Sequence, residues 1–266
     1  MDLELQGKAA LVTGGSRGIG KAVARELAAE GVDVALLARG RDALEATAAE
    51  LAQASGRRML PIVADTSSDD SVRAAVGQAV QAFGHVDILV NCAAQPGGQA
   101  PPPPLAEITD EAFYSDVNVK VMGYLRCIRE VAPHMKRQGW GRIVNISGLA
   151  ARQTGSTIGS MRNVAVVSMT KNLADELGPH GINVTVVHPG MTRTEKAEEV
   201  IRAAAERQGI SLEEAERRRY ANNAIGRVID ARDIAVVVAF LASPRSVAIN
   251  GDVIAAGGGA RGTIHY

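Results

Sequence analysis

Short aliphatic runs alternate along the chain with longer stretches rich in alanine and charged residues. The short runs predict β-strands, and the longer stretches, with apolar positions at helical spacing, predict helices. Because each helix returns the chain to the same edge of a parallel sheet, this alternation predicts one doubly wound α/β domain. The expected strands are residues 9–13, 32–38, 60–64, 88–91, 143–147, 182–187 and 252–256, and the expected helices are residues 21–29, 42–53, 70–82, 111–137 and 164–177.

Two segments interrupt this alternation. Residues 96–104 read Pro-Gly-Gly-Gln-Ala-Pro-Pro-Pro-Pro, and proline removes a backbone donor and fixes φ, so we expect a loop. The loop is either a semi-rigid spacer or a rim that faces the substrate. Residues 195–222 form a charged insertion with two helical patterns that separate at residues 209–211. The insertion is either a solvated helical flap or a mobile lid over a site.

Composition narrows the class of partner. The 266 residues include 29 Lys and Arg and 29 Asp and Glu, so no net basic field favours nucleic acid or an anionic membrane. A small molecule is the expected partner. Cys92 and Cys127 lack the spacing of a metal site or a disulfide framework, so we expect buried thiols and no bound metal. The sequence shows no signal-peptide pattern and no membrane-length apolar run, which favours a cytoplasmic enzyme.

A glycine-rich loop joins the first strand to the first helix. Residues 13–20 read Thr-Gly-Gly-Ser-Arg-Gly-Ile-Gly, and glycine in such a loop lets backbone amides approach a pyrophosphate at the helix N-terminus. The spacing in this context predicts a single Rossmann-type dinucleotide-binding domain over residues 1–266. The residues expected to contact the cofactor in this loop are Gly14, Ser16, Arg17, Gly18, Ile19 and Gly20.

The end of the second strand indicates which dinucleotide binds. A chain that prefers NAD places a carboxylate there for the ribose hydroxyls, whereas this chain has Ala38 followed by Arg39. Arg39 and Arg17 offer two guanidinium groups whose geometry suits a 2′-phosphate. The expected cofactor is therefore NADP(H), with NAD(H) less favoured. The alternative is that one or both arginines are only solvated.

Motifs after later strands make the chain resemble the short-chain dehydrogenase/reductase family along almost its whole length. Residues 91–94, Asn-Cys-Ala-Ala, are similar to the family's Asn-Asn-Ala-Gly, and residues 189–194, Pro-Gly-Met-Thr-Arg-Thr, to its Pro-Gly-x-x-x-Thr. The resemblance implies that Asp65 contacts adenine, Ala93 lines the ribose path, and Thr192 and Thr194 lie by the nicotinamide. It also implies a homotetramer or homodimer built through the long helices and the last strand. With it, the expected cofactor contacts extend to Asp65, Thr66, Asn91, Ala93, Pro189, Gly190, Thr192 and Thr194.

The catalytic residues depart from the family pattern. The family uses an Asn, a Ser and a Tyr-x-x-x-Lys pair, in which the lysine lowers the tyrosine pKa for general acid/base catalysis. Asn118 matches the first of these. The expected serine position falls on Gly148, and Ser147 is the candidate to take its place, because the region is about two residues shorter than the family pattern. Alignment through residues 166–171 puts Gly159 at the tyrosine position and Asn163 at the lysine position.

Two residues near the vacated positions are candidate substitutes. His188 is the better proton donor by chemistry, because imidazole titrates near neutral pH, but it is also consistent with a structural histidine at a strand end. Arg162 offers a charged donor that stabilises an oxyanion, unless it faces the surface or the cofactor. Asn118 also has a structural reading, since an Asn in a long helix bridges backbone groups or water.

Three functions remain open at this point. The first is an NADP(H)-dependent oxidoreductase acting on a small carbonyl or alcohol with a non-standard proton donor. The second is a catalytically inactive relative that serves as a dinucleotide sensor or as a structural partner. The third, less favoured, is lyase or hydrolase chemistry in the vacated pocket, because function depends on sites and not on folds.

Overall fold

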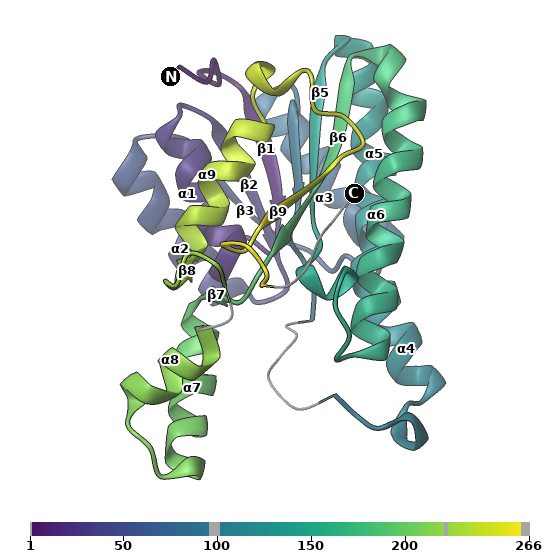
Figure 1. Ribbon diagram of the computed structural model, residues 1–266. Helices are drawn as coiled ribbons and strands as arrows, with labels where there is room; N and C mark the ends of the chain where they lie inside the picture. The colour runs from purple at the N-terminus through teal and green to yellow at the C-terminus, as the bar shows by residue number, and fades with distance from the viewer. Residues whose placement is uncertain (1, 96–101, 221–222, 262–266) are drawn as a thin grey trace.

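The computed structural model describes residues 2–95, 102–220 and 223–261, and it shows a parallel sheet with helices on both faces (Figure 1). The predicted doubly wound α/β fold is confirmed. The seven strands of the sheet are β1 (Ala9–Thr13), β2 (Asp33–Ala38), β3 (Met59–Val63), β4 (Ile88–Asn91), β5 (Gly141–Ile146), β6 (Ile182–Pro189) and β9 (Val253–Ala256). The helices on its faces are α1 (Gly18–Ala29), α2 (Arg41–Ser55), α3 (Asp69–Phe83), α5 (Gly123–Gln138), α6 (Thr157–Leu177) and α9 (Ala231–Leu241).

The strand order fixes where a ligand binds. The order is β3-β2-β1-β4-β5-β6-β9, so the direction in which successive strands are added reverses between β1 and β4. In register, Thr13 at the end of β1 pairs with Asn91 at the end of β4, and Asn91 pairs with Asn145 in β5. In open α/β sheets, ligands bind outside the carboxyl ends of the strands at this reversal.

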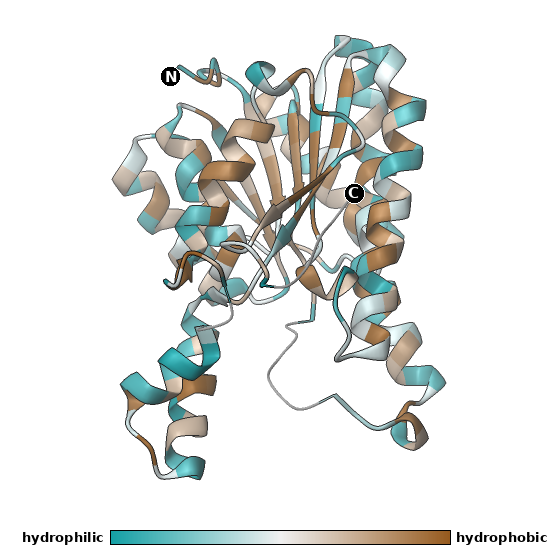
Figure 2. Cartoon of the chain, viewed as in Figure 1, coloured by the Kyte–Doolittle hydropathy of each residue, from teal (hydrophilic) through white to brown (hydrophobic). Residues whose placement is uncertain are grey.

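Burial on both faces of the sheet explains why its strands read as unbroken aliphatic runs. One core lies between the sheet and α1, α2 and α9, and it includes Leu27, Leu44 and Val238. The other lies against α3, α5 and α6, and it includes Val131 and Leu177. Figure 2 shows the brown strands enclosed between helices with polar outer faces. None of the described helices combines the length and apolar character that a bilayer crossing requires.

The segment that was expected to be one long helix at residues 111–137 is composite. It begins as α4 (Asp110–Val117), passes through a five-residue π-helical segment (Asn118–Met122), and continues as α5. The expected extent is correct, but the expectation of a single helix was wrong. The π segment contains β-branched valines, which crowd an α-helical turn. The π segment begins at Asn118, a candidate catalytic residue, and π-helical turns occur often at functional sites.

Two further helix assignments differ from the sequence expectation. Helix α6 begins at Thr157 instead of residue 164, because the Ser156 side chain accepts a hydrogen bond from the Gly159 N–H and caps the helix. Helix α9 had no predicted counterpart, because its apolar residues show no clear helical period. Asp230 and Asp233 form the capping box that starts α9.

The charged insertion contains two helices, α7 (Glu195–Gln208) and α8 (Leu212–Tyr220), and Gly209 ends α7 with φ of 63°. In Figure 1 they extend below the sheet, on the side opposite α4. Their base is a short two-stranded sheet of β7 (Thr192–Arg193) and β8 (Ile229–Asp230). Arg193 donates hydrogen bonds to Asp230 and Glu216, which tie the base to α8. The predicted proline loop lies mostly outside the described residues, because residues 96–101 are not among them.

The close packing of the glycine loop is testable. A Cβ on Gly20 would lie 2.2 Å from the Gly14 carbonyl oxygen, which is backbone and has little freedom to move. We expect Gly20→Ala to destabilise the protein by about 1–3 kcal/mol through overpacking. The matched control is Gly77→Ala on the exposed face of α3, where a Cβ meets nothing within 4 Å. That change should stabilise by about 0.5–1 kcal/mol, so equal effects in chemical denaturation would contradict the packing argument.

Candidate active site

The ends of β1 and β4 lie close together where the glycine loop begins. The Thr13 hydroxyl oxygen accepts hydrogen bonds from the Cys92 and Ala93 amides, both at 3.0 Å. Gly14 has φ of 68°, and a Cβ there would lie 3.1 Å from the Ala93 nitrogen. A side chain at Gly14 would therefore be strained and would close the approach between the two strand ends.

The N-terminus of α1 binds an anionic oxygen. The Gly18 amide donates a hydrogen bond of 2.9 Å to Oε2 of Glu195, the first residue of α7. Free amides and the helix dipole make this position favourable for negative charge. The Glu195 carboxylate stands in for a phosphate oxygen, so the loop fits the pyrophosphate of a dinucleotide.

The rest of the loop and the neighbouring strand ends carry the other predicted cofactor residues. Arg17 and Arg39 are both exposed, Ile19 packs partly on the core, and the Ser16 carbonyl accepts from the Thr47 hydroxyl. Asp65 follows β3. Burial opposes its charge, but hydrogen bonds from Ser67 and the positive charge of Arg39 hold the pKa of Asp65 below its usual value. Asp65 is thus an acceptor that stays ionised near Arg39.

Several residues that were predicted to contact the cofactor make hydrogen bonds or packing contacts within the protein. Asn91 is fully buried and donates to Oδ1 of Asn145, which orders the two strand ends. Thr66 donates to the Val119 carbonyl, and Pro189 is buried at the end of β6. After β6, Gly190 lies against Gly257, and the Thr192 hydroxyl donates to the Gly190 carbonyl. Thr194 caps α7, and its side chain lies 3.6 Å from where a Cβ on Gly18 would be.

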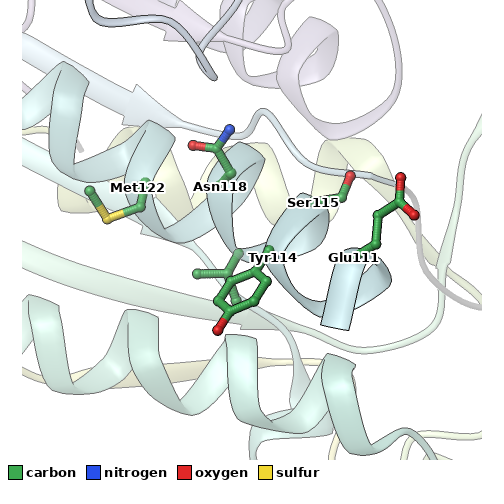
Figure 3. A pocket seen from close by; sticks show the side chains of 6 residues that line it. Glu111, Tyr114, Ser115, Asn118 and Met122 are labelled. Atoms are coloured by element: carbon green, nitrogen blue, oxygen red, sulfur yellow. The ribbon is translucent and has the colours of Figure 1, made fainter. Parts of the chain in front are cut away.

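Asn118 is hydrogen-bonded to an arginine of the following helix. Its Oδ1 accepts from Arg126 at 2.8 Å. It lines an open hollow of about 650 Å³ together with Glu111, Tyr114, Ser115, Val117 and Met122 (Figure 3). The Asn118 side chain is thus hydrogen-bonded to Arg126 at the edge of this hollow, while Ser147 and Asn163 are bonded to one another.

Lys120, two positions after Asn118, is the residue that sequence reasoning missed. Only 4% of it is exposed, and its Nζ donates to the Ser147 carbonyl and to Oδ1 of Asn163, both at 3.0 Å. Burial, assisted by the positive charge of Arg162, lowers the pKa of Lys120 from 10.5 to about 7. The one available signal was a lysine within the valine-rich run of residues 117–122.

Ser147, Gly148, Asn163 and His188 form one buried cluster at the carboxyl ends of β5 and β6. The Ser147 hydroxyl donates to the Asn163 carbonyl at 3.1 Å. The Gly148 amide donates to Nδ1 of the fully buried His188 at 3.2 Å. Because Nδ1 accepts this bond, the neutral ring carries its proton on Nε2. The structure thus brings Ser147 and His188 to one site.

Arg162 forms an ion pair beside the predicted tyrosine position. Its Nη1 contacts both carboxylate oxygens of Asp116, at 2.7 and 2.8 Å. Its Nη2 lies 3.8 Å from where a Cβ on Gly159 would stand. The guanidinium group is therefore next to the space that a phenol would enter from position 159, and Asp116 already balances its charge.

Neither cysteine nor the nearby tyrosine is poised for proton transfer. Burial raises the pKa of Cys92 and of Cys127 to about 12, so both thiols stay protonated at neutral pH. The Tyr124 hydroxyl donates to the Ile146 carbonyl at 2.9 Å, and burial raises its pKa well above 10.0. Tyr124 lies near the cluster as a core residue and is a poor acid.

Comparison with known proteins identifies the family. The sequence matches the short chain dehydrogenase family over residues 8–205. The short-chain reductase protein NovJ of Streptomyces niveus is 37% identical over 256 residues, which cover 96% of this chain and 94% of NovJ. This chain therefore belongs to the short-chain dehydrogenase/reductase family of oxidoreductases.

Solved structures agree with this membership. L-Sorbose reductase from Gluconobacter frateurii, complexed with NADPH and L-sorbose, has a TM-score of 0.93 at 28% identity, covering 99% of this chain and all of the other. A variant of actinorhodin polyketide ketoreductase with NADPH has a TM-score of 0.86 at 34% identity, covering 94% of this chain and 96% of the other. The family resemblance seen in the motifs is confirmed.

The buried lysine makes stability depend on pH. Between about pH 7 and 10.5 the unfolded chain binds the Lys120 proton and the folded chain does not, so this group makes stability rise with pH. The slope is at most about 1.4 kcal/mol per pH unit. We expect Lys120→Met to lose this slope in chemical denaturation across the window, whereas Lys171→Met, at an exposed lysine of α6, should keep it. Equal slopes in all three proteins would refute the lowered pKa.

Proposed function

We propose that the protein is an NADP(H)-dependent oxidoreductase that interconverts a small carbonyl compound and its alcohol without the family's Tyr-x-x-x-Lys pair. The observation that carries the cofactor part is the Gly18 amide, which binds a carboxylate oxygen at the N-terminus of α1. When bound, NADP(H) supplies or accepts the hydride, and the protein must orient the substrate and manage one proton at its oxygen.

The charges around the adenosine end favour the phosphorylated cofactor. Arg17 and Arg39 are exposed at the ends of the loop and of β2, where two guanidinium groups suit a 2′-phosphate. Asp65 lies near Arg39 and keeps its negative charge, as a contact to adenine requires. Both solved relatives described above are NADPH complexes, which supports the same choice here.

The residues at the proposed reaction site are Ser147, Asn163, Arg162 and His188. Gly159 and Asn163, in this proposal, stand at the tyrosine and lysine positions of the family. His188 stays a candidate proton donor, and Asn163 is a candidate hydrogen-bond partner of the substrate oxygen. Ser147 is a second candidate, but to donate to that oxygen its hydroxyl must release the Asn163 carbonyl. The Arg162 charge is balanced by Asp116, so an oxyanion role for Arg162 requires that ion pair to loosen.

A second proposed function depends on the residue at position 159. Gly159 carries no hydroxyl, and Tyr124, near the cluster, is buried and donates to a backbone carbonyl. A relative that binds the dinucleotide as a sensor or structural partner would bind NADPH without turnover. Lyase or hydrolase chemistry is the third proposal, and turnover by protein stripped of nicotinamide would distinguish it.

We also propose a homodimer or homotetramer. Large apolar side chains are exposed on α4 and α6, namely Tyr114, Met161 and Val164. Helices of this kind cover such side chains when two copies associate in closed symmetry.

Cofactor preference provides the direct test of the proposal. We expect the purified protein to bind NADPH more tightly than NADH, and Arg39→Ala to weaken NADPH about 10- to 100-fold, since a charge-assisted hydrogen bond contributes about 1.5–3 kcal/mol. NADH affinity should be nearly unchanged. The control is Arg41→Ala, because Arg41 is an exposed arginine two residues away that pairs with Glu45.

Fluorescence titration of both cofactors checks this expectation. Tighter binding of NADH, or equal loss of NADPH affinity in both variants, would contradict the role of Arg39. If neither cofactor binds, the proposed function fails.

Glu195 gives a second prediction at the same site. Its carboxylate accepts the Gly18 N–H hydrogen bond that a phosphate oxygen of NADPH would accept, so NADPH must displace the carboxylate. We expect Glu195→Gln to tighten NADPH binding roughly two- to fivefold, since a charge at a helix N-terminus is worth about 0.3–1 kcal/mol. The control is Glu198→Gln, at an exposed position one turn along α7. Weaker binding by Glu195→Gln, measured in the same titration, would show that the carboxylate does not compete.

A further inference from the structure

Lys120 reaches into the buried cluster from a different helix than the one that carries the family's lysine position. It lies in the π-helical segment between α4 and α5, and Asn163 lies on α6. The Nζ of Lys120 contacts Oδ1 of Asn163 and the Ser147 carbonyl, both at 3.0 Å. The amino group of Lys120 is thus in contact with the side chain that occupies position 163.

This contact fixes the orientation of the Asn163 amide. Because Oδ1 accepts from Lys120, Nδ2 is on the opposite branch of the amide. Nδ2 lies 3.1 Å from where a Cβ on Gly148 would stand. Asn163 therefore holds a donor toward the space beside Gly148, the position expected for the family's catalytic hydroxyl.

The charged and titratable groups that surround Lys120 come from four elements. Asp116 on α4 and Arg162 on α6 form an ion pair whose charges cancel. Cys92 after β4 and Tyr124 on α5 both have raised pKa values and are neutral at physiological pH. Among Asp116, Arg162, Cys92, Tyr124 and Lys120, the charge that changes near neutral pH is therefore that of Lys120, while His188 lies in the same buried cluster, bonded to the Gly148 amide.

We propose that Lys120 is a positioning residue of the active site, which holds the Asn163 amide with Nδ2–H toward the substrate space and supplies from the neighbouring helix a buried positive charge. The inference rests on the proposed function, because it assigns the charge to a site that takes NADP(H) and a carbonyl substrate. A lysine in place of Asn163 would bring a second amino group against the Nζ of Lys120, which now contacts Oδ1 of Asn163.

The proposal links cofactor binding to protonation. NADPH brings several negative charges to the adjacent cradle, and a nearby opposite charge favours the protonated form of a lysine. Since burial lowers the pKa of free Lys120 to about 7, NADPH binding near neutral pH should raise the fraction of Lys120 that carries a proton. Binding should therefore take up roughly half a proton.

Calorimetric titration with NADPH in two buffers of different ionisation enthalpy measures this uptake. We expect uptake by the wild type and by Lys171→Met, whose lysine is exposed on α6, and almost none by Lys120→Met. Thermal melts in parallel establish that each variant is folded. NADPH binding without uptake, or the same uptake by Lys120→Met, would overturn the inference. Absence of NADPH binding by the wild type is a different result, which overturns the proposed function and the inference together.

A double-mutant cycle tests whether Lys120 acts through Asn163. We expect Lys120→Met and Asn163→Leu each to lower kcat for carbonyl reduction about 10- to 100-fold, and the double variant to lose no more than either one. The wild-type rate should fall as pH rises and Lys120 loses its charge, and the rate of Lys120→Met should not. Additive losses, or a pH profile shared by both proteins, would show that Lys120 does not position Asn163.

Discussion

The Thr13 hydroxyl holds the ends of β1 and β4 together, and the cofactor cradle depends on that contact. It accepts from two successive amides, Cys92 and Ala93, which no backbone partner of β1 satisfies at the strand end. With the strands fixed, Gly14 passes close to Ala93, and α1 begins within reach of the reversal in strand order. The anion-binding amide of Gly18 is therefore placed by packing at the strand ends.

Much of this architecture is readable from the sequence because it depends on local pattern. The predicted bounds of β1 and β4 are those observed, since both strands are short, aliphatic and wholly buried. Helix α9 is apolar on most faces, so the apolar residues of its sequence show no helical period, and the pattern of apolar residues does not reveal its capping box. The start of α6 was missed because Ser156 caps a turn that contains glycine, which the pattern of apolar residues does not show.

The candidate site is less readable because its contacts join distant residues. Lys120 is 27 residues from Ser147 and 43 from Asn163, and a lone lysine between valines gives no sign of either partner. The sequence presents Arg162 as an unpaired cation, but in the structure Asp116, 46 residues away, forms an ion pair with it. Motif spacing gives only expected positions for the family's catalytic residues, and the tertiary structure adds the ion pairs and hydrogen bonds of the side chains near those positions.

The same distance argument applies to the helical insertion. Glu195 is 177 residues from Gly18, yet one hydrogen bond joins the first residue of α7 to the amide at the start of α1. An anion that takes this amide must break the bond, and Thr194, which caps α7, lies beside Gly18 as well. Arg193, one residue earlier, is held by Asp230 and Glu216, so the base of the insertion stays anchored when the Glu195 contact is lost. The contact that an anion would replace is therefore made by the N-terminal turn of α7, whereas the contacts of the two-stranded base are made by other residues.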